Sequence, residues 1–123
     1  KGISIAVEGS PANVYGVKRL LYEIVYNLCD NAIKYNRQSG SVKISTVSEG
    51  GFSSVTVSDT GIGIAPEYQD KVWQRFWQAD PSHGEDGGCG LGLAMVKEIV
   101  QFHGGSVALD STPGKGSTFS VTI

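Results

Sequence analysis

The sequence predicts an α+β fold in which helices cover one face of a largely antiparallel sheet. Apolar residues alternate in five short segments and recur at helical spacing in two longer ones, in the order β-α-β-β-loop-α-β-β. Two pairs of neighbouring strands are separated only by short turns, and strands joined in this way pair antiparallel. The chain has 123 residues, which is enough for one core. The prediction is therefore one two-layer domain over residues 1–123.

The first third of the chain is predicted to hold one strand and one long helix. Ile3, Ile5 and Val7 alternate with small or polar residues, which indicates a half-buried strand. A helix is predicted from about residue 15 to residue 35, because apolar side chains recur there at helical spacing. The residues of this apolar face are Leu21, Ile24, Val25, Leu28 and Ala32.

Two hairpins and a second helix follow. Residues 41–48 and 51–58 are predicted to be strands joined by a tight turn. Residues 80–88 are polar and rich in Gly, which indicates a loop, and residues 91–103 form an amphipathic helix. The second hairpin is expected from strands at 106–109 and 117–123. The apolar positions of the first hairpin are Val42, Ile44, Phe52, Val55 and Val57.

Charge and composition argue against several classes of partner. Ten basic and twelve acidic residues give a net charge of −2 without a basic block, so no nucleic-acid partner is expected. No apolar run approaches the roughly 18 residues of a membrane span, so no direct membrane contact is expected. The two cysteines form neither a disulfide nor a zinc pattern, which favours a reducing cytoplasm. The first residue is Lys1 rather than Met, and we expect a piece of a longer protein.

Four polar residues of the first predicted helix share one stripe. Asn27, Asn31, Lys34 and Tyr35 are spaced i, i+4, i+7 and i+8, which places them together at about 100° per residue. Amide oxygens one turn apart suit a hard cation such as Mg²⁺, and a lysine suits phosphate. The alternative is an ordinary solvated helix face.

Two glycine-rich segments add further candidates. Asp59 opens a turn with Gly61 and Gly63, where a carboxylate can accept the exocyclic amine of adenine; the alternative is an ordinary Asp-x-Gly turn. Residues 87–92 carry four glycines directly before a helix, and backbone N–H groups at a helix start attract anions. A polar loop precedes them and no Gly-Lys-Ser/Thr is present, so neither a dinucleotide turn nor a Walker loop fits. A flexible linker is the alternative.

Taken in order, these segments resemble the catalytic and ATP-binding domain of bacterial sensor histidine kinases, in the gyrase, Hsp90 and MutL ATPase superfamily. Residues 27–35 resemble the N box, 59–63 the G1 box, 72–77 the F box, 88–92 the G2 box and 116–119 the last Gly-Thr element. The resemblance implies a two-layer Bergerat ATP-binding fold, with about five mostly antiparallel strands covered on one face by about three helices.

The resemblance also implies that the chain binds ATP with Mg²⁺. Asn31 would bind the metal, Asp59 would accept the adenine amine, and Thr118 would lie beneath the adenine. Catalytic roles are implied for Asn27, Lys34 and Arg75, with Arg75 near the terminal phosphate. The residues implied in nucleotide binding are Asn27, Asn31, Lys34, Tyr35, Asp59, Gly61, Ile62, Gly63, Phe76, Gly88, Gly90, Leu91, Gly92 and Thr118.

The activity that the resemblance implies is that of a protein-histidine kinase. The chain would donate the γ-phosphoryl group of ATP to a histidine on a separate dimerisation and phosphotransfer domain, with a response regulator downstream. Residues 80–88 would form the ATP lid, and the chain would be a cytoplasmic domain of a membrane-anchored sensor. No segment resembles the phosphoacceptor helix, so the chain alone is expected to bind nucleotide without phosphorylating itself.

Asn27 favours phosphoryl transfer over hydrolysis. In the hydrolysing relatives a Glu stands at this position and activates water, and an amide cannot take that proton. Two alternatives stay open. One is a superfamily relative such as an anti-sigma factor serine kinase, and the other is a degenerate module that binds nucleotide without transferring phosphate.

Overall fold

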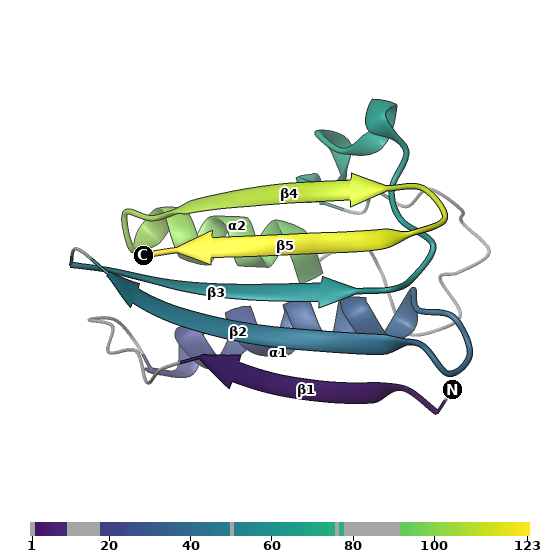
Figure 1. Ribbon diagram of the computed structural model, residues 1–123. Coiled ribbons are helices and arrows are strands. Elements are labelled where there is room, and N and C mark those ends of the chain that lie inside the picture. Colours follow the sequence, from purple (N-terminus) through teal and green to yellow (C-terminus); the bar gives the residue numbers. More distant parts are fainter. Residues whose placement is uncertain (1, 10–17, 50, 76, 78–91) are drawn as a thin grey trace.

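The computed structural model describes residues 2–9, 18–49, 51–75, 77 and 92–123. Within them, a five-stranded sheet is covered on one face by helices α1 and α2, as Figure 1 shows. The predicted two-layer α+β sandwich is therefore confirmed. The elements are β1 (Ser4–Gly9), α1 (Lys18–Lys34), β2 (Ser41–Glu49), β3 (Phe52–Asp59), the 3₁₀ turns η1 (Pro66–Tyr68) and η2 (Lys71–Trp73), α2 (Gly92–Phe102), β4 (Ser106–Thr112) and β5 (Gly116–Thr122).

The sheet is mixed but mostly antiparallel, with the strand order β1-β2-β3-β5-β4. Among the strands that the structure describes, only β1 pairs in parallel, with β2, and the other three pairings are antiparallel. Strand β1 was expected to be half-buried, and this expectation is wrong. Ile5 and Val7 are 56% and 72% exposed, because β1 is an edge strand that the helical layer leaves open.

Both predicted hairpins are present, and the first shows how register decides burial. In β2 and β3, Ile44 lies opposite Val57, so every second residue from Val57 faces the helices. That alternation puts Ser53 in the buried layer and turns Phe52 to the other face, where it is 63% exposed. Of the apolar positions of this hairpin, Phe52 therefore lies outside the core.

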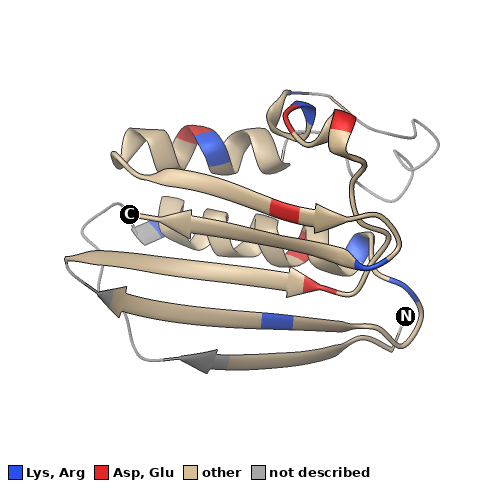
Figure 2. Cartoon of the chain, turned by 45° about the horizontal axis from the view of Figure 1, so that its top comes forward, with Lys and Arg blue, Asp and Glu red and all other residues tan. Residues whose placement is uncertain are grey.

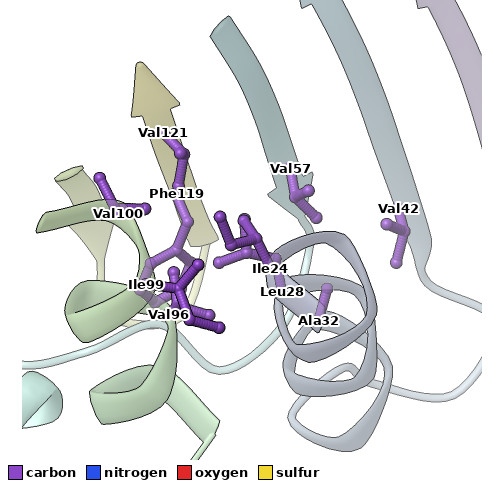
Figure 3. Packing of buried hydrophobic residues seen from close by; sticks show 10 residues of the cluster. All are labelled: Ile24, Leu28, Ala32, Val42, Val57, Val96, Ile99, Val100, Phe119 and Val121. Carbon is purple, nitrogen blue, oxygen red and sulfur yellow. The ribbon is translucent and has the colours of Figure 1, made fainter. Parts of the chain in front are cut away.

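The core lies between the sheet and the two helices. Figure 3 shows side chains from three strands meeting those of α1 and α2. The ten residues of this cluster are Ile24, Leu28, Ala32, Val42, Val57, Val96, Ile99, Val100, Phe119 and Val121. Trp73 of η2 packs edge-on against Phe119, with 5.6 Å between ring centroids, and this contact fixes the aromatic segment beside α2.

Most charged residues lie on helices and turns, and few lie along the strands, as Figure 2 shows for the described residues. None of the helices in the described part of the chain has the length and apolar character needed to cross a bilayer.

Candidate functional site

Asn27 connects α1 with the start of α2. Its Nδ2 donates a hydrogen bond to the Glu23 carbonyl oxygen at 2.8 Å, which fixes the amide and leaves Oδ1 on the side of α2. A Cβ added to Gly92 would lie 3.1 Å from that oxygen. The helix stripe and the glycine-rich segment, 65 positions apart in the sequence, therefore meet at the first residue of α2.

Lys34 and Tyr35 lie where α1 ends. The Lys34 ammonium forms an ion pair with Asp30, one turn earlier, at 2.9 Å. Asn31 of α1 and Tyr35, directly after α1, are half-buried, and the Tyr35 N–H donates to the Asn31 carbonyl at 3.2 Å. The predicted stripe of Asn27, Asn31, Lys34 and Tyr35 thus begins on a formed helix and ends at its last turn.

Asp59 is the last residue of β3, and one oxygen of its carboxylate is already hydrogen-bonded. Oδ1 accepts the Gly61 N–H at 2.8 Å and the Ser117 N–H at 3.3 Å, and these are the side-chain hydrogen bonds of Asp59 within the described residues. Burial raises the pKa of this carboxyl above 3.8, although both backbone hydrogen bonds act in the opposite direction. In the described part of the chain no hydrogen bond reaches the second oxygen, Oδ2, which leaves it for an external donor.

The turn after Asp59 is held against the end of α1. Ile62 N–H donates to the Tyr35 carbonyl at 3.1 Å, and a Cβ on Gly61 would lie only 2.2 Å from that same oxygen. Gly63 has φ +74°, and a Cβ there would lie 2.3 Å from the Thr112 carbonyl. The two glycines predicted to shape this turn are therefore sterically required.

Thr118, which the resemblance places beneath the adenine, lies opposite Ser58 rather than opposite Asp59 in the pairing of β3 with β5. Its Oγ1 lies 3.0 Å from Ser58 Oγ, and successive residues of a strand face opposite sides of the sheet. Thr118 consequently faces away from the helices, while Asp59 lies opposite Ser117. Sequence reasoning missed Ser117, which is 7% exposed and donates its backbone N–H to the carboxylate. The strand alternation set by buried Phe119 was the available signal.

Arg75 is paired away from the start of α2. Its Nε and Nη2 both donate to Glu98 Oε1, the first at 3.0 Å, and both side chains are more than half exposed. Glu98 is six residues beyond Gly92, which corresponds to about 9 Å along the helix axis. The structure therefore does not bring Arg75 to the residues around Asn27. The expected binding residues Phe76, Gly88, Gly90 and Leu91, and the expected lid at 80–88, lie outside the described residues.

The side chains present fit a magnesium ion that is shared with phosphates. Within the described residues there is no group of three His, Cys, Asp or Glu that could hold a metal by itself. Mg²⁺ prefers oxygen ligands and usually keeps several waters, so one or two amide oxygens with phosphate oxygens would complete its shell. The fixed Asn27 amide, whose oxygen faces α2, matches that requirement.

Residues 16–123 match the family described as Histidine kinase-, DNA gyrase B-, and HSP90-like ATPase. The chain belongs to this family. Among the curated relatives of this chain, the sensor-like histidine kinase SenX3 of Mycolicibacterium smegmatis is 43% identical over 89% of this chain and 29% of its own length. The circadian input-output histidine kinase CikA of Synechococcus elongatus is 44% identical over 84% of this chain and 14% of its own length. The chain spans less than a third of either relative.

Solved structures of the family agree with the fold. The mycobacterial sensor histidine kinase MprB superposes with a TM-score of 0.87 at 30% identity, covering 99% of this chain and 81% of that one. Full-length ShkA in complex with AMPPNP gives a TM-score of 0.85 at 31% identity, covering 98% of this chain and 25% of that one. The ATPase-like family is thus shown by sequence and by structure.

Proposed function

We propose that this chain binds ATP with Mg²⁺ and donates the γ-phosphoryl group to a histidine on a separate helical domain. The observation that carries the proposal is the convergence of three distant segments on one side of the sheet. An amide oxygen of α1 faces the start of α2, and the turn that carries the Asp59 carboxylate is hydrogen-bonded to the end of α1. The complex of ShkA with AMPPNP is that of a relative at 31% identity.

Each group would act on a different part of the nucleotide. Asp59 Oδ2 would accept the exocyclic amine of adenine, while Oδ1 stays bound to the Gly61 and Ser117 N–H groups. The backbone N–H groups at the start of α2 would hold phosphates. Asn31 and Asn27 would hold Mg²⁺, which when bound would neutralise phosphate charge. Lys34 would exchange part of its Asp30 contact for a phosphate oxygen.

Asn27 favours transfer to another molecule over hydrolysis. Its amide has no basic site for the proton of an attacking water, and its Nδ2 already donates to Glu23. In the proposed step, the bond between the γ-phosphorus and the bridging oxygen of ADP breaks and a bond to an imidazole nitrogen forms. ADP leaves with the bond electrons, and the acceptor imidazole loses its proton to solvent. Positioning and electrostatics then supply most of the catalysis, as is usual for phosphoryl transfer.

The partners follow from this chemistry and from the relatives. The two relatives are named as histidine kinases, SenX3 as a sensor-like one, and both are more than three times as long as this chain. We propose that the acceptor histidine, and any membrane anchor, belong to a part of the full-length protein outside these 123 residues. A response regulator would then receive the phosphoryl group from that histidine. The chain would then be the cytoplasmic catalytic part of such a sensor.

Two measurements on the 123-residue chain test the proposal. Isothermal titration calorimetry with AMPPNP and Mg²⁺ is expected to show one site. The corresponding GTP analogue, GMPPNP, should bind more weakly, because guanine presents a carbonyl oxygen to Asp59 where adenine presents an amine. Absence of binding at millimolar nucleotide would instead identify a degenerate module. Incubation with γ-labelled ATP should leave the chain unlabelled, and label on the chain would refute a separate acceptor.

A further inference from the structure

A buried side-chain amide joins the end of α1 to the two strands beside it. Asn36, the second residue after α1, is 6% exposed. Its Nδ2 donates to the Ser41 carbonyl at 2.9 Å, and its Oδ1 accepts the Arg37 N–H at 2.9 Å and the Thr60 hydroxyl at 3.1 Å. Both ends of the amide are thus used, and a buried amide in such a network has one orientation.

Thr60 is the partner that connects this amide to the turn after β3. Its Oγ1 accepts the Ser41 N–H at 2.9 Å while donating to Asn36, so the hydroxyl is satisfied in both roles. Its backbone N–H donates to the Ser41 carbonyl at 3.2 Å. Thr60 directly follows Asp59, so these bonds fix the chain one residue from the carboxylate.

The neighbouring glycine leaves room for the pair. A Cβ on Gly40 would lie 2.1 Å from Asn36 Oδ1 and 2.8 Å from Thr60 Oγ1. Both distances are below any normal contact of a Cβ atom, so a larger residue at position 40 would displace the pair. The absence of a side chain here is an independent sign that the amide and the hydroxyl need this arrangement.

Arg37 extends the network to the far hairpin. Its Nε donates to the Thr60 carbonyl at 2.5 Å, and its Nη2 donates to the Gly114 carbonyl at 3.3 Å. Gly114 lies in the turn between β4 and β5, and β5 supplies the Ser117 N–H that holds Asp59 Oδ1. The segments on both sides of the carboxylate are therefore connected through the residues that follow α1.

We propose that Asn36, Thr60 and Arg37 are positioning residues for adenine recognition. They contact neither the nucleotide nor Mg²⁺; they hold the Thr60 backbone, and through it they direct Asp59 Oδ2 to the exocyclic amine. This inference rests on the proposed function. It adds that the purine selectivity of the site depends on a side-chain network between the end of α1 and the turn after β3.

The test removes one hydroxyl and keeps the shape of its side chain. Thr60→Val deletes the bond to Asn36, and Thr60→Ser keeps it as the conservative control. Titration calorimetry compares ADP with an analogue whose purine lacks the exocyclic amine, both with Mg²⁺. We expect the preference of the parent for ADP to fall about threefold to tenfold in Thr60→Val and to persist in Thr60→Ser. Binding of the amine-free analogue should stay unchanged, a selectivity that a general loss of structure would not produce.

The outcomes separate this inference from the function on which it rests. A parent that binds both nucleotides equally overturns the adenine assignment itself. A parent that prefers ADP, with a Thr60→Val variant that keeps the full preference, overturns the positioning role alone, as does a Thr60→Ser variant that loses as much. If Thr60→Val does not fold, Arg37→Met replaces it. Arg37 is exposed, and its Nε donates to the backbone carbonyl of Thr60, so this variant also releases the Thr60 backbone. A reduced preference in Arg37→Met supports the inference, and an unchanged one overturns it.

Discussion

Replacing Asp59 with Asn should weaken nucleotide binding without weakening the fold. An Asn side chain can keep its carbonyl oxygen on the Gly61 and Ser117 N–H groups, which places an NH₂ group where Oδ2 now lies. This NH₂ group and the exocyclic amine of adenine are both hydrogen-bond donors, so they could not bind each other. The loss of a hydrogen bond to a charged acceptor corresponds to about 1.5–3 kcal/mol, which is about a tenfold to hundredfold rise in Kd.

The stability of the free chain should change in the other direction. Burial raises the Asp59 pKa, so the charged form is disfavoured in the folded state at neutral pH. A neutral amide removes that unfavourable contribution, and the thermal midpoint without nucleotide should be equal to or higher than that of the parent. A gain in stability accompanied by a loss of affinity distinguishes a binding residue from a structural one.

The assay pairs calorimetric titration of AMPPNP and Mg²⁺ with thermal unfolding of the free chain. Asp110→Asn is the matched control, since Asp110 is exposed on β4 and lies opposite Thr118 on the sheet face away from the helices. It should leave Kd unchanged. The reasoning fails if Asp59→Asn binds within twofold of the parent, or if Asp110→Asn loses as much affinity.

Four further outcomes are expected. Asn31→Asp should change the Mg²⁺ dependence of nucleotide binding, because it adds charge beside the phosphates; identical Mg²⁺ titrations of variant and parent would exclude Asn31 from the metal site. Nucleotide affinity should fall as pH drops through the raised pKa of Asp59, because protonation removes the acceptor, and Asp59→Asn should lack this step. Because the pKa of Asp59 is higher in the folded state, protonation of this carboxyl stabilises the folded chain. This stabilisation is fully present below pH 3.8 and is lost as pH rises through the folded-state pKa. Phe119→Ala should lower the free energy of unfolding by about 3–5 kcal/mol in urea titrations, since Phe119 is 1% exposed and contacts Trp73; a loss under 1 kcal/mol, roughly that of an exposed site, would contradict the packing.

Local patterns predicted much of this molecule. Helical spacing located α1, with Ile24, Leu28 and Ala32 on its buried face, and alternation located both hairpins. These patterns succeed because the 3.6-residue and 2-residue periods are properties of the backbone itself. The order of the glycine-rich segments was likewise sufficient to indicate the ATPase-like family that the comparisons show.

Contacts between distant elements could not be predicted in the same way. The outward position of Phe52 and the partner of Asp59 both depend on strand register, where a shift of one residue exchanges the two faces of the sheet. The pairing of Arg75 with Glu98 depends on how the aromatic segment packs beside α2.

The sequence by itself determined the α+β order of elements, the helix stripe that starts at Asn27, and the carboxylate and glycines of the turn at Asp59, because each is a local arrangement of neighbouring residues. Only the tertiary structure decided that Ser117 rather than Thr118 lies opposite Asp59, and that the buried Asn36 amide binds the half-buried Thr60 hydroxyl beside Gly40. These residues come together through strand pairing and through the packing of α1 against the sheet. Such contacts join residues far apart in the sequence, and no local periodicity records them.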